Sequence, residues 1–238
     1  MSEGRLPALD GPVLMDQEWR DAAFLHWRVD PAVVAPWMPS GARVDVLDGA
    51  TYVGLIGFVM HRAGFGSGRP VPFFGDFVEV NVRLYSTDAA GRKGVVFASL
   101  DAERLAVVGL AGLLGVRYRW ARADARREDE RLTYRSQRLA PPHRGARTDL
   151  VLRTRDEPAD DALSVFLTAR WCMHTQVAGR GAYVPNTHEP WPLRVAEVVR
   201  CEDGLVAAAG LGGLTARAPD SVLWSPGVRT RFGLPRWV

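Results

Sequence analysis

Residues Phe77–Tyr85 read FVEVNVRLY, and this short stretch decides the fold that we expect. Aliphatic side chains alternate strictly with a second set, which is Glu79, Asn81, Arg83 and Tyr85. Successive side chains of a β-strand point to opposite faces of its sheet, so the alternation predicts a strand with one apolar face and one polar face.

The polar face of this strand carries a candidate binding site. Alternate residues of a strand lie about 6.6 Å apart, which puts the Cα atoms of Glu79 and Arg83 roughly 13 Å apart with Asn81 between them. An acid, an amide and a guanidinium can converge on one small ligand, and the guanidinium fork suits a carboxylate. The alternative is a solvated face, which is the usual outcome for the polar side of an alternating strand.

Outward from this strand, short runs rich in Val, Ile, Leu, Phe and Tyr alternate with Gly, Pro, Asp and Asn, which is typical of a β-rich barrel or sandwich. Asp48-Gly49 favours a tight hairpin turn. The strands that we expect are Arg43–Leu47, Ala50–Met60, Gly94–Leu100, Tyr118–Ala123, Leu132–Leu139, Thr148–Thr154, Arg170–Val177, Leu193–Cys201 and Val222–Trp224.

Helices are few in this interpretation. The main one is expected over Ala102–Leu114, capped by Asp101, with short helices at Asp30–Met38 and Asp160–Thr168. The segment His61–Asp76 is rich in glycine and proline, so we expect a long loop there. Turns are expected at Pro185–Pro192 and at Ser225–Gly227.

Composition places the chain among ordinary globular proteins. Of 238 residues, 47% are hydrophobic and 24% are charged, close to the usual averages. No linker or repeat divides the chain, and we expect one domain spanning residues 1–238.

The charge balance does not indicate a nucleic-acid partner. Thirty basic residues against 27 acidic ones give a net charge of +3. The densest basic stretch, Arg117–Arg138, contains four acidic residues among its arginines, which favours a solvated hairpin of mixed charge over a phosphate-binding surface. Lys93 is the single lysine of the sequence.

Metals, cofactors and membranes are likewise not expected. Cys172 and Cys201 lack zinc-site spacing and predict buried free thiols. His26 and His188 could serve in proton transfer, although packed histidines are commoner. No secretory signal or membrane-length apolar run is visible, so the protein is expected in the cytoplasm.

Several stretches together resemble a known family, the uncharacterised bacterial YqjF-like family of the acetoacetate-decarboxylase-like superfamily. They occur in order along the chain: FLHWRVDP at Phe24–Pro31, MPSGARVDVLDGATYVGL at Met38–Leu55, FVEVNVRLY at Phe77–Tyr85, FASLDA at Phe97–Ala102, LTAR at Leu167–Arg170, HEPWPL at His188–Leu193 and SPGV at Ser225–Val228.

The resemblance implies a β-rich α+β fold, an acetoacetate-decarboxylase-like barrel or double sheet around a central cavity. It has one main helix and short flanking helices, and the Glu79 strand lines the cavity. In the decarboxylases of this superfamily a lysine that follows the main helix forms an imine with the keto acid. The corresponding stretch here is Gly115–Arg119, which has Tyr118 and Arg119 at the lysine positions. An arginine stays protonated and cannot replace an amine nucleophile.

We therefore expect binding of an oxo-acid or other anionic metabolite without imine chemistry. Arg83 and Arg119 would hold the anion, Glu79 would act as acid or base in a lyase, cyclase or isomerase reaction, and Tyr118 and Tyr85 would stabilise an oxyanion. The alternative is a non-catalytic ligand-binding or sensor domain that has lost the lysine. A third interpretation is an assembly protein with Trp224 and Trp237 at an interface, and the superfamily makes a homo-oligomer a further expectation.

Overall fold

Strands make up most of the structure. This computed structural model describes residues 8–66, 69–70, 75–103 and 118–238. The strands of the described residues are β1 (Val13–Val29), β2 (Ala42–Val44), β3 (Thr51–Phe65), β4 (Arg69–Pro70), β5 (Phe77–Asp88), β6 (Lys93–Ala102), β7 (Tyr118–Glu128), β8 (Arg131–Arg138), β9 (Arg147–Pro158), β10 (Cys172–Val177), β11 (Arg180–His188), β12 (Arg194–Asp203), β13 (Ser221–Gly233) and β14 (Arg236–Trp237).

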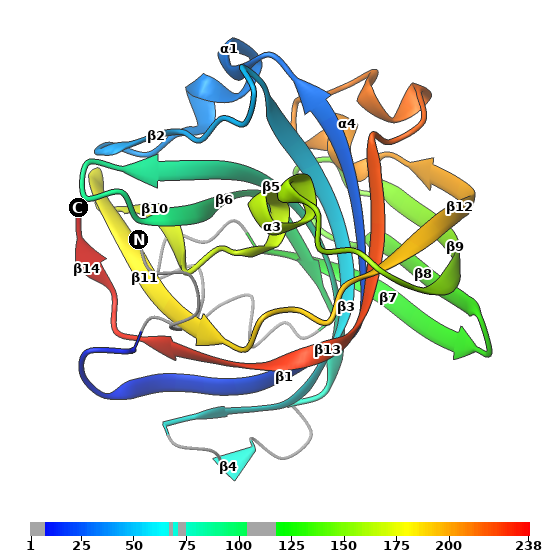
Figure 1. Cartoon of the computed structure of the whole chain (residues 1–238), viewed down its shortest axis with the longest axis horizontal. Helices are drawn as coiled ribbons and strands as arrows, with labels where there is room; N and C mark the ends of the chain where they lie inside the picture. Colours follow the sequence, from blue (N-terminus) through cyan, green and yellow to red (C-terminus); the bar gives the residue numbers. More distant parts are fainter. Residues whose placement is uncertain (1–7, 67–68, 71–74, 104–117) are drawn as a thin grey trace.

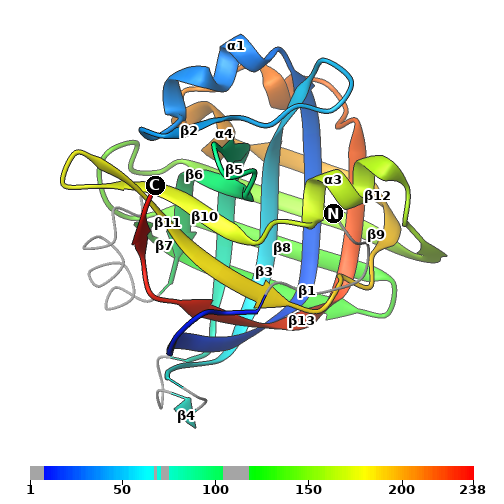
Figure 2. The same cartoon turned by 60° about the vertical axis from the view of Figure 1, so that its left-hand side comes forward.

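The strands join into one mixed sheet, in the order β14-β11-β10-β6-β7-β8-β9-β12-β13-β1-β3-β5-β2. Two further pairings, β5 with β6 and β11 with β13, bring distant parts of this path into contact. The β6–β7 and β6–β10 pairs are parallel. In Figures 1 and 2, β1, β3 and β13 run side by side as a long central wall, from which the remaining strands curve away on both sides.

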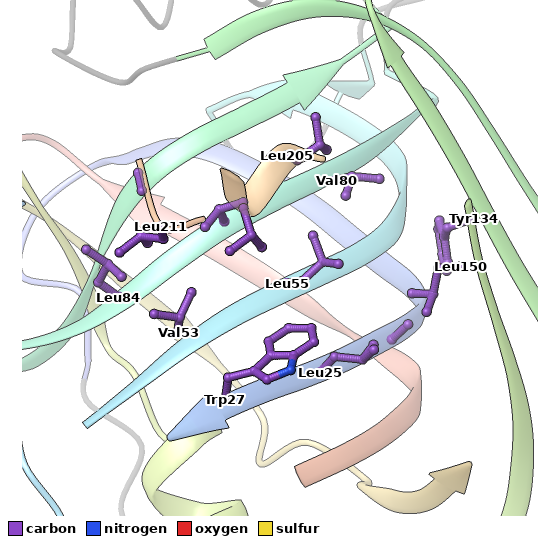
Figure 3. Close-up of a cluster of buried hydrophobic side chains, with 14 of the residues drawn as sticks. Leu25, Trp27, Val53, Leu55, Val80, Leu84, Tyr134, Leu150, Leu205 and Leu211 are labelled. Carbon is purple, nitrogen blue, oxygen red and sulfur yellow. The ribbon is translucent and has the colours of Figure 1, made fainter. Parts of the chain in front are cut away.

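One face of this wall supports the largest apolar cluster (Figure 3). Trp27 of β1, Leu55 of β3 and Leu84 of β5 are completely buried there. The short helix α4 (Leu205–Ala208) fills the middle of the cluster with Leu205 and Val206, and strands β8 and β9 close its far side with Tyr134 and Leu150. Burial of these large side chains stabilises the fold by about 1.5–3 kcal/mol each.

The β-rich prediction is confirmed, but two long strands were missed. The longest, β1, contains the polar and charged stretch Asp16–Asp21, which breaks a simple alternating pattern. A bulge there, with Asp21 at φ 50°, shifts the pairing between Arg20 and Ala23. Side chains that share a face change from odd to even positions at the bulge, from Trp19 to Ala22. Strand β11 was missed because its last four residues lie in a proline-containing segment that we expected to turn.

The predicted hairpin at Asp48-Gly49 is only partly right. Both residues have positive φ, and a bridge between Leu47 and Ala50 forms the tight turn. The preceding strand β2 nevertheless pairs with β5 and not with β3. The loop predicted at His61–Asp76 was also too long, because β3 continues to Phe65 and pairs with β4. Ser225–Gly227, expected to turn, lies within β13.

The short helices agree with their expected caps. Asp30 accepts a hydrogen bond from the backbone of Ala32 at the start of α1 (Pro31–Val34), which continues as the 3-10 turn η1 (Ala35–Trp37). A second 3-10 turn, η2 (Leu214–Ala216), follows α4. Asp161 caps α3 (Ala162–Thr168) in the same way as Asp30. The main helix predicted at Ala102–Leu114 falls almost entirely outside the described residues, and its first residue, Ala102, ends β6.

Within the described part of the chain, we find no helix with the length and apolar character needed to cross a membrane.

Candidate functional site

Both faces of β5 are buried, so the polar row is not a solvated face. Glu79 and Asn81 are each 2% exposed, and Arg83 is partly buried. At the two ends of the row, Phe77 belongs to an apolar cluster with Phe24 and Phe58, and Tyr85 belongs to another with Phe166. The strand therefore holds an acid, an amide and a guanidinium between two apolar clusters.

The carboxylate of Glu79 is held by neutral donors. The Tyr118 hydroxyl donates to Oε2 at 2.9 Å, and Nδ2 of Asn81 donates to Oε1 at 3.2 Å. Tyr118 reaches Glu79 because β7 lies parallel to β6, which puts Tyr118 beside Leu100, and Leu100 lies opposite Asn81 of β5. No ion pair links Glu79 to Arg83 among the described residues.

This environment changes the acidity of both groups. Burial raises the pKa of Glu79 to about 7, against smaller opposing effects of the Tyr118 and Asn81 hydrogen bonds. The negative charge of Asp101 adds a further small increase. Burial also raises the pKa of Tyr118 well above its usual value, and the adjacent Glu79 reinforces that shift. Tyr118 therefore stays protonated, whereas Glu79 exchanges its proton near neutral pH.

The guanidinium of Arg83 is oriented by a helix end and by aromatic rings. Its Nη2 donates to the carbonyl of Leu167 at 3.1 Å, and its Nε donates to the Tyr85 hydroxyl at 3.3 Å. The guanidinium carbon lies 5.5 Å from the ring centre of Phe24 and 5.7 Å from that of Tyr85. A cation is favourable both at a helix C-terminus and over an aromatic face.

A buried hydrogen-bonded chain continues from Arg83 through Tyr85 to His26. Nε2 of His26 lies 2.6 Å from the Tyr85 hydroxyl. Burial lowers the pKa of His26 well below its usual value, and the nearby charge of Arg83 lowers it further. His26 is therefore neutral. Because the Tyr85 oxygen accepts from Arg83, its hydroxyl hydrogen is available to Nε2, and we assign the remaining His26 proton to Nδ1.

Sequence reasoning missed Arg170. Its side chain is 4% exposed, its Nη1 pairs with Asp45 at 2.5 Å, and its Nε donates to the carbonyl of Phe166 at 2.7 Å. The guanidinium also lies over the rings of Phe166 and Tyr85, at 4.3 and 4.9 Å. Arg170 thus packs against the ring of Tyr85 and links it to Phe166. The available signal was its position in the LTAR stretch directly after a short helix.

His188 lies within an aromatic group. Its ring centre is 4.7 Å from Trp171, 5.5 Å from Trp191 and 6.3 Å from Trp19. Its Nδ1 lies 2.7 Å from the carbonyl oxygen of Glu189, and because a carbonyl can only accept, Nδ1 carries the proton and donates. Burial lowers the pKa of His188, and the positive charge of Arg83 lowers it further. The aromatic group around His188 therefore lies close enough to the polar row of β5 to experience the charge of Arg83.

Arg119 does not join this arrangement. It lies opposite Asp101 in the β6–β7 pairing, and strand alternation turns its side chain to the face opposite Tyr118. Lys93 begins β6 and lies opposite Thr87 of β5. Its amine lies 3.7 Å from Asp45, and its side chain is 48% exposed. Trp224, expected at the surface, is 6% exposed within the large apolar cluster.

Among the described residues, no group of three or more His, Cys, Asp or Glu side chains is arranged to hold a metal ion.

Comparison with known proteins places the chain in a family. Residues 16–229 match the family described as "Uncharacterized conserved protein". The chain is 30% identical over 193 residues to the "Uncharacterized protein YqjF" of Bacillus subtilis (strain 168), covering 79% of this chain and 78% of the relative. The chain belongs to this YqjF-like family. The expected resemblance is thereby confirmed.

Solved structures share the fold at low sequence identity. An acetoacetate decarboxylase from Legionella pneumophila aligns over 100% of this chain and 92% of its own length, with a TM-score of 0.69 and 16% identity. An acetoacetate decarboxylase-like enzyme from Sphingomonas wittichii RW1 covers 97% and 94%, with a TM-score of 0.66 and 15% identity. The enduracididine biosynthesis enzyme MppR, complexed with pyruvate, covers 97% and 91%, with a TM-score of 0.63 and 14% identity. The YqjF-like chain therefore has an acetoacetate-decarboxylase-like fold.

Proposed function

We propose that this YqjF-like protein binds a small anionic oxo-acid or related metabolite beside the polar face of β5, and that Glu79 transfers a proton to or from it. The observation that carries the proposal is the Glu79 carboxyl, which is buried, held only by neutral donors among the described residues, and has a pKa raised to about 7. A proton-transfer group works best when its pKa lies near the working pH. A structural ion pair with Arg83 would instead keep the carboxylate charged.

Arg83 is the group that we assign to the anionic end of the ligand. Nε and Nη2 are engaged by Tyr85 and Leu167, and among the described residues no hydrogen bond engages Nη1. A guanidinium fixed at two nitrogens is already oriented, so less conformational entropy is lost when a carboxylate binds. Arg83 and Glu79 lie four residues apart on the same face of β5, which suits a ligand with a carboxylate at one end and a reactive carbon at the other.

The proton step that we propose occurs next to a carbonyl group. The Glu79 carboxylate takes a proton from the carbon beside the carbonyl; the electron pair of the broken C–H bond forms the C=C bond of an enolate, and the π pair of the carbonyl moves to its oxygen. When protonated Glu79 returns the proton to that oxygen, the net reaction is a keto–enol isomerisation. When the enolate instead re-forms its carbonyl and expels a leaving group from the next carbon, that group departs with its electron pair and takes the Glu79 proton, which gives a lyase reaction. In this proposal Arg83 supplies the positive charge for the developing negative charge, and Tyr85, whose hydroxyl hydrogen goes to His26, positions the guanidinium.

Imine chemistry has no support in this chain. The sequence has one lysine, Lys93, which lies opposite Thr87 of β5. Thr87 is eight residues from Glu79, roughly 26 Å along an extended strand. The amine is partly exposed and lies 3.7 Å from Asp45, so it is far from the carboxyl that would handle the proton.

Deuterium exchange tests the proposal directly. Pyruvate and 2-oxobutyrate are incubated with the protein in D2O, and loss of the C3 proton signal is followed by NMR. We expect catalysed exchange with the wild type, a loss of at least about a hundredfold with Glu79→Gln, and no change with the exposed control Glu197→Gln. Exchange that is equal in all three proteins would overturn the role of Glu79.

Binding is measured in parallel by calorimetry. Arg83→Ala should weaken pyruvate binding by at least about tenfold, since a hydrogen bond to a charged group is worth about 1.5–3 kcal/mol. Arg43→Ala, at an exposed position, should leave the affinity unchanged. Binding that depends on Arg83 without any catalysed exchange would favour the non-catalytic sensor. Equal affinity for wild type and Arg83→Ala would remove Arg83 from the site.

A further inference from the structure

A second group of polar atoms lies buried on β1, β13 and β11, which follow β3 along the sheet from β5. The group consists of four side-chain atoms that have no hydrogen-bond partner among the described residues. They are Gln17 Oε1 and Trp19 Nε1 of β1, Thr230 Oγ1 of β13 and Asn186 Oδ1 of β11. The side chains of Gln17, Thr230 and Asn186 are at least nine-tenths buried, at 3%, 0% and 7% exposure. A buried polar atom without a partner costs about 1–3 kcal/mol, so a cluster of them indicates a missing partner.

The strand register brings these atoms together. Gln17 pairs with Thr230 across β1 and β13, and Thr230 pairs with His188 across β13 and β11. Directly opposite residues of neighbouring strands point to the same face, with Cβ atoms about 5 Å apart. Trp19 is two residues beyond Gln17 on the same face, and Asn186 is two residues before His188. The group therefore forms one continuous polar patch.

This patch faces the same side as Glu79. The ring centre of Trp19 lies 5.3 Å from that of Phe58, and Phe58 is the direct cross-strand neighbour of Glu79. The charge of Arg83 contributes to the lowered pKa of His188 at the edge of the patch. A ligand bound to Arg83 could therefore extend from β5 toward β1, β13 and β11.

The patch is neutral and bounded by flat aromatic surfaces. Its free atoms are amide oxygens, one indole N–H and one hydroxyl, which together provide acceptors and donors without a charge. Trp19 stacks on Trp191 at 5.7 Å with the two planes 13° apart, and His188 lies 4.7 Å from Trp171. Such walls favour a planar group over a branched or charged one.

We propose that Gln17, Trp19, Asn186 and Thr230 form a second subsite, which binds a neutral planar ring bearing both hydrogen-bond donors and acceptors. This inference deepens the proposed function and rests on it in one respect: the ring and the anion held by Arg83 are two ends of one substrate. The substrate class is then an oxo-acid that carries a polar heterocyclic or cyclic-amide ring. Apolar phenyl rings would leave the buried amide oxygens unpaired and are disfavoured.

The test uses ring probes without a carboxylate, so that it reports on this subsite independently of Arg83. Uracil is the polar planar probe and benzene is the apolar ring of the same size, each titrated by ligand-observed NMR. We expect uracil to bind wild type and Arg83→Ala equally, and to bind at least about tenfold more tightly than benzene. Thr230→Val and Gln17→Met should each weaken uracil binding by about tenfold and leave pyruvate binding unchanged.

Two variants are used so that poor folding of one does not decide the result. Thermal unfolding identifies a folded variant, and Thr175→Val serves as a Thr→Val control, because Thr175 is also buried but lies on β10. The subsite is overturned if uracil binds no better than benzene, or if neither Thr230→Val nor Gln17→Met weakens it. Failure of the proposed function gives a different result, namely pyruvate binding that is insensitive to Arg83→Ala.

Discussion

The Tyr118 hydroxyl donates a 2.9 Å hydrogen bond to Oε2 of Glu79, and this contact joins β7 to the acid of β5. The bond stabilises the carboxylate form and offsets part of the increase caused by burial, which leaves the pKa of Glu79 at about 7. Tyr118→Phe should therefore raise the Glu79 pKa further, by about one to two units for a hydrogen bond to a charged group.

The shift is measured as the midpoint of the pH profile for deuterium exchange into pyruvate, which we expect to move to higher pH because the carboxylate is the active form. Carbon-13 NMR of labelled glutamate provides a second readout that needs no activity. A midpoint that stays fixed or moves to lower pH would contradict the assigned hydrogen bond.

Gly54 makes room for the contact between His26 and Tyr85. A Cβ atom at Gly54 would lie 3.1 Å from Cδ2 of His26 and 3.2 Å from the Tyr85 hydroxyl. Gly54→Ala should destabilise the fold by about 1–3 kcal/mol through overpacking, and should weaken pyruvate binding because Tyr85 bonds to Arg83. Gly212→Ala is the matched control, since a Cβ there meets nothing within 4 Å. Urea unfolding of the two variants checks the prediction, and equal stability would contradict it.

The strand FVEVNVRLY could be predicted because strict alternation has one structural interpretation. The burial of its polar face could not be predicted, because alternation does not say whether a second layer of structure covers that face. Here the cover comes from residues far away in the sequence, such as Phe166 and Leu167 of α3, which no local pattern relates to β5. The resemblance to a family supplied what periodicity could not.

Other parts of the site depended on features that local patterns do not encode. The bulge at Asp21 changes which β1 residues share a face, so the alignment of Gln17 and Trp19 with Phe24 and His26 is invisible in a simple alternation. Strand alternation turns Tyr118 and Arg119 to opposite faces of β7, and the parallel β6–β7 pairing places Tyr118 beside Leu100 on the face that carries Glu79. We expected both residues at the site because they are adjacent at the positions of the decarboxylase lysines.

Asp101 and Arg138 form a buried ion pair near the site. Asp101 is 0% exposed, its Oδ1 accepts from Nη2 of Arg138 at 2.7 Å, and Ser99 bonds to both. Asp101→Asn leaves a buried guanidinium without its counter-charge, so we expect a loss of about 3–5 kcal/mol. The double variant Asp101→Leu with Arg138→Met should recover part of that loss. Urea unfolding measures both, and a double variant no more stable than Asp101→Asn would contradict the explanation.

Ser86, His174 and Asp88 form a hydrogen-bonded set that resembles a hydrolase triad in composition only. Ser86 Oγ lies 2.8 Å from Nδ1 of His174, and Asp88 Oδ2 lies 3.2 Å from Nε2. In serine hydrolases the aspartate bonds to Nδ1 and the serine to Nε2, so the order is reversed here. Ser86 is also 0% exposed. We expect no adduct with a fluorophosphonate probe by mass spectrometry, and a labelled Ser86 would contradict this interpretation.

The raised pKa of Glu79 should make stability depend on pH. Its folded pKa of about 7 exceeds the ordinary value of 4.5, so the folded state holds this proton more tightly than the unfolded state. The stabilisation is complete below pH 4.5 and is lost as pH rises through about 7, by about 3 kcal/mol in total. Glu79→Gln stays neutral and should lack this loss. Between pH 4.5 and pH 7.5 the unfolding free energy of the wild type should therefore fall relative to that of Glu79→Gln.

Urea unfolding at a series of pH values measures this difference, with exposed Glu197→Gln as the matched control. Other groups that titrate contribute equally to the wild type and to Glu79→Gln, so their effects cancel in the comparison. A difference that is constant with pH, or that changes in the opposite direction, would mean that Glu79 is charged in the folded protein. That result would also remove the proton-transfer role, because a carboxyl with an ordinary pKa holds almost no proton at pH 7.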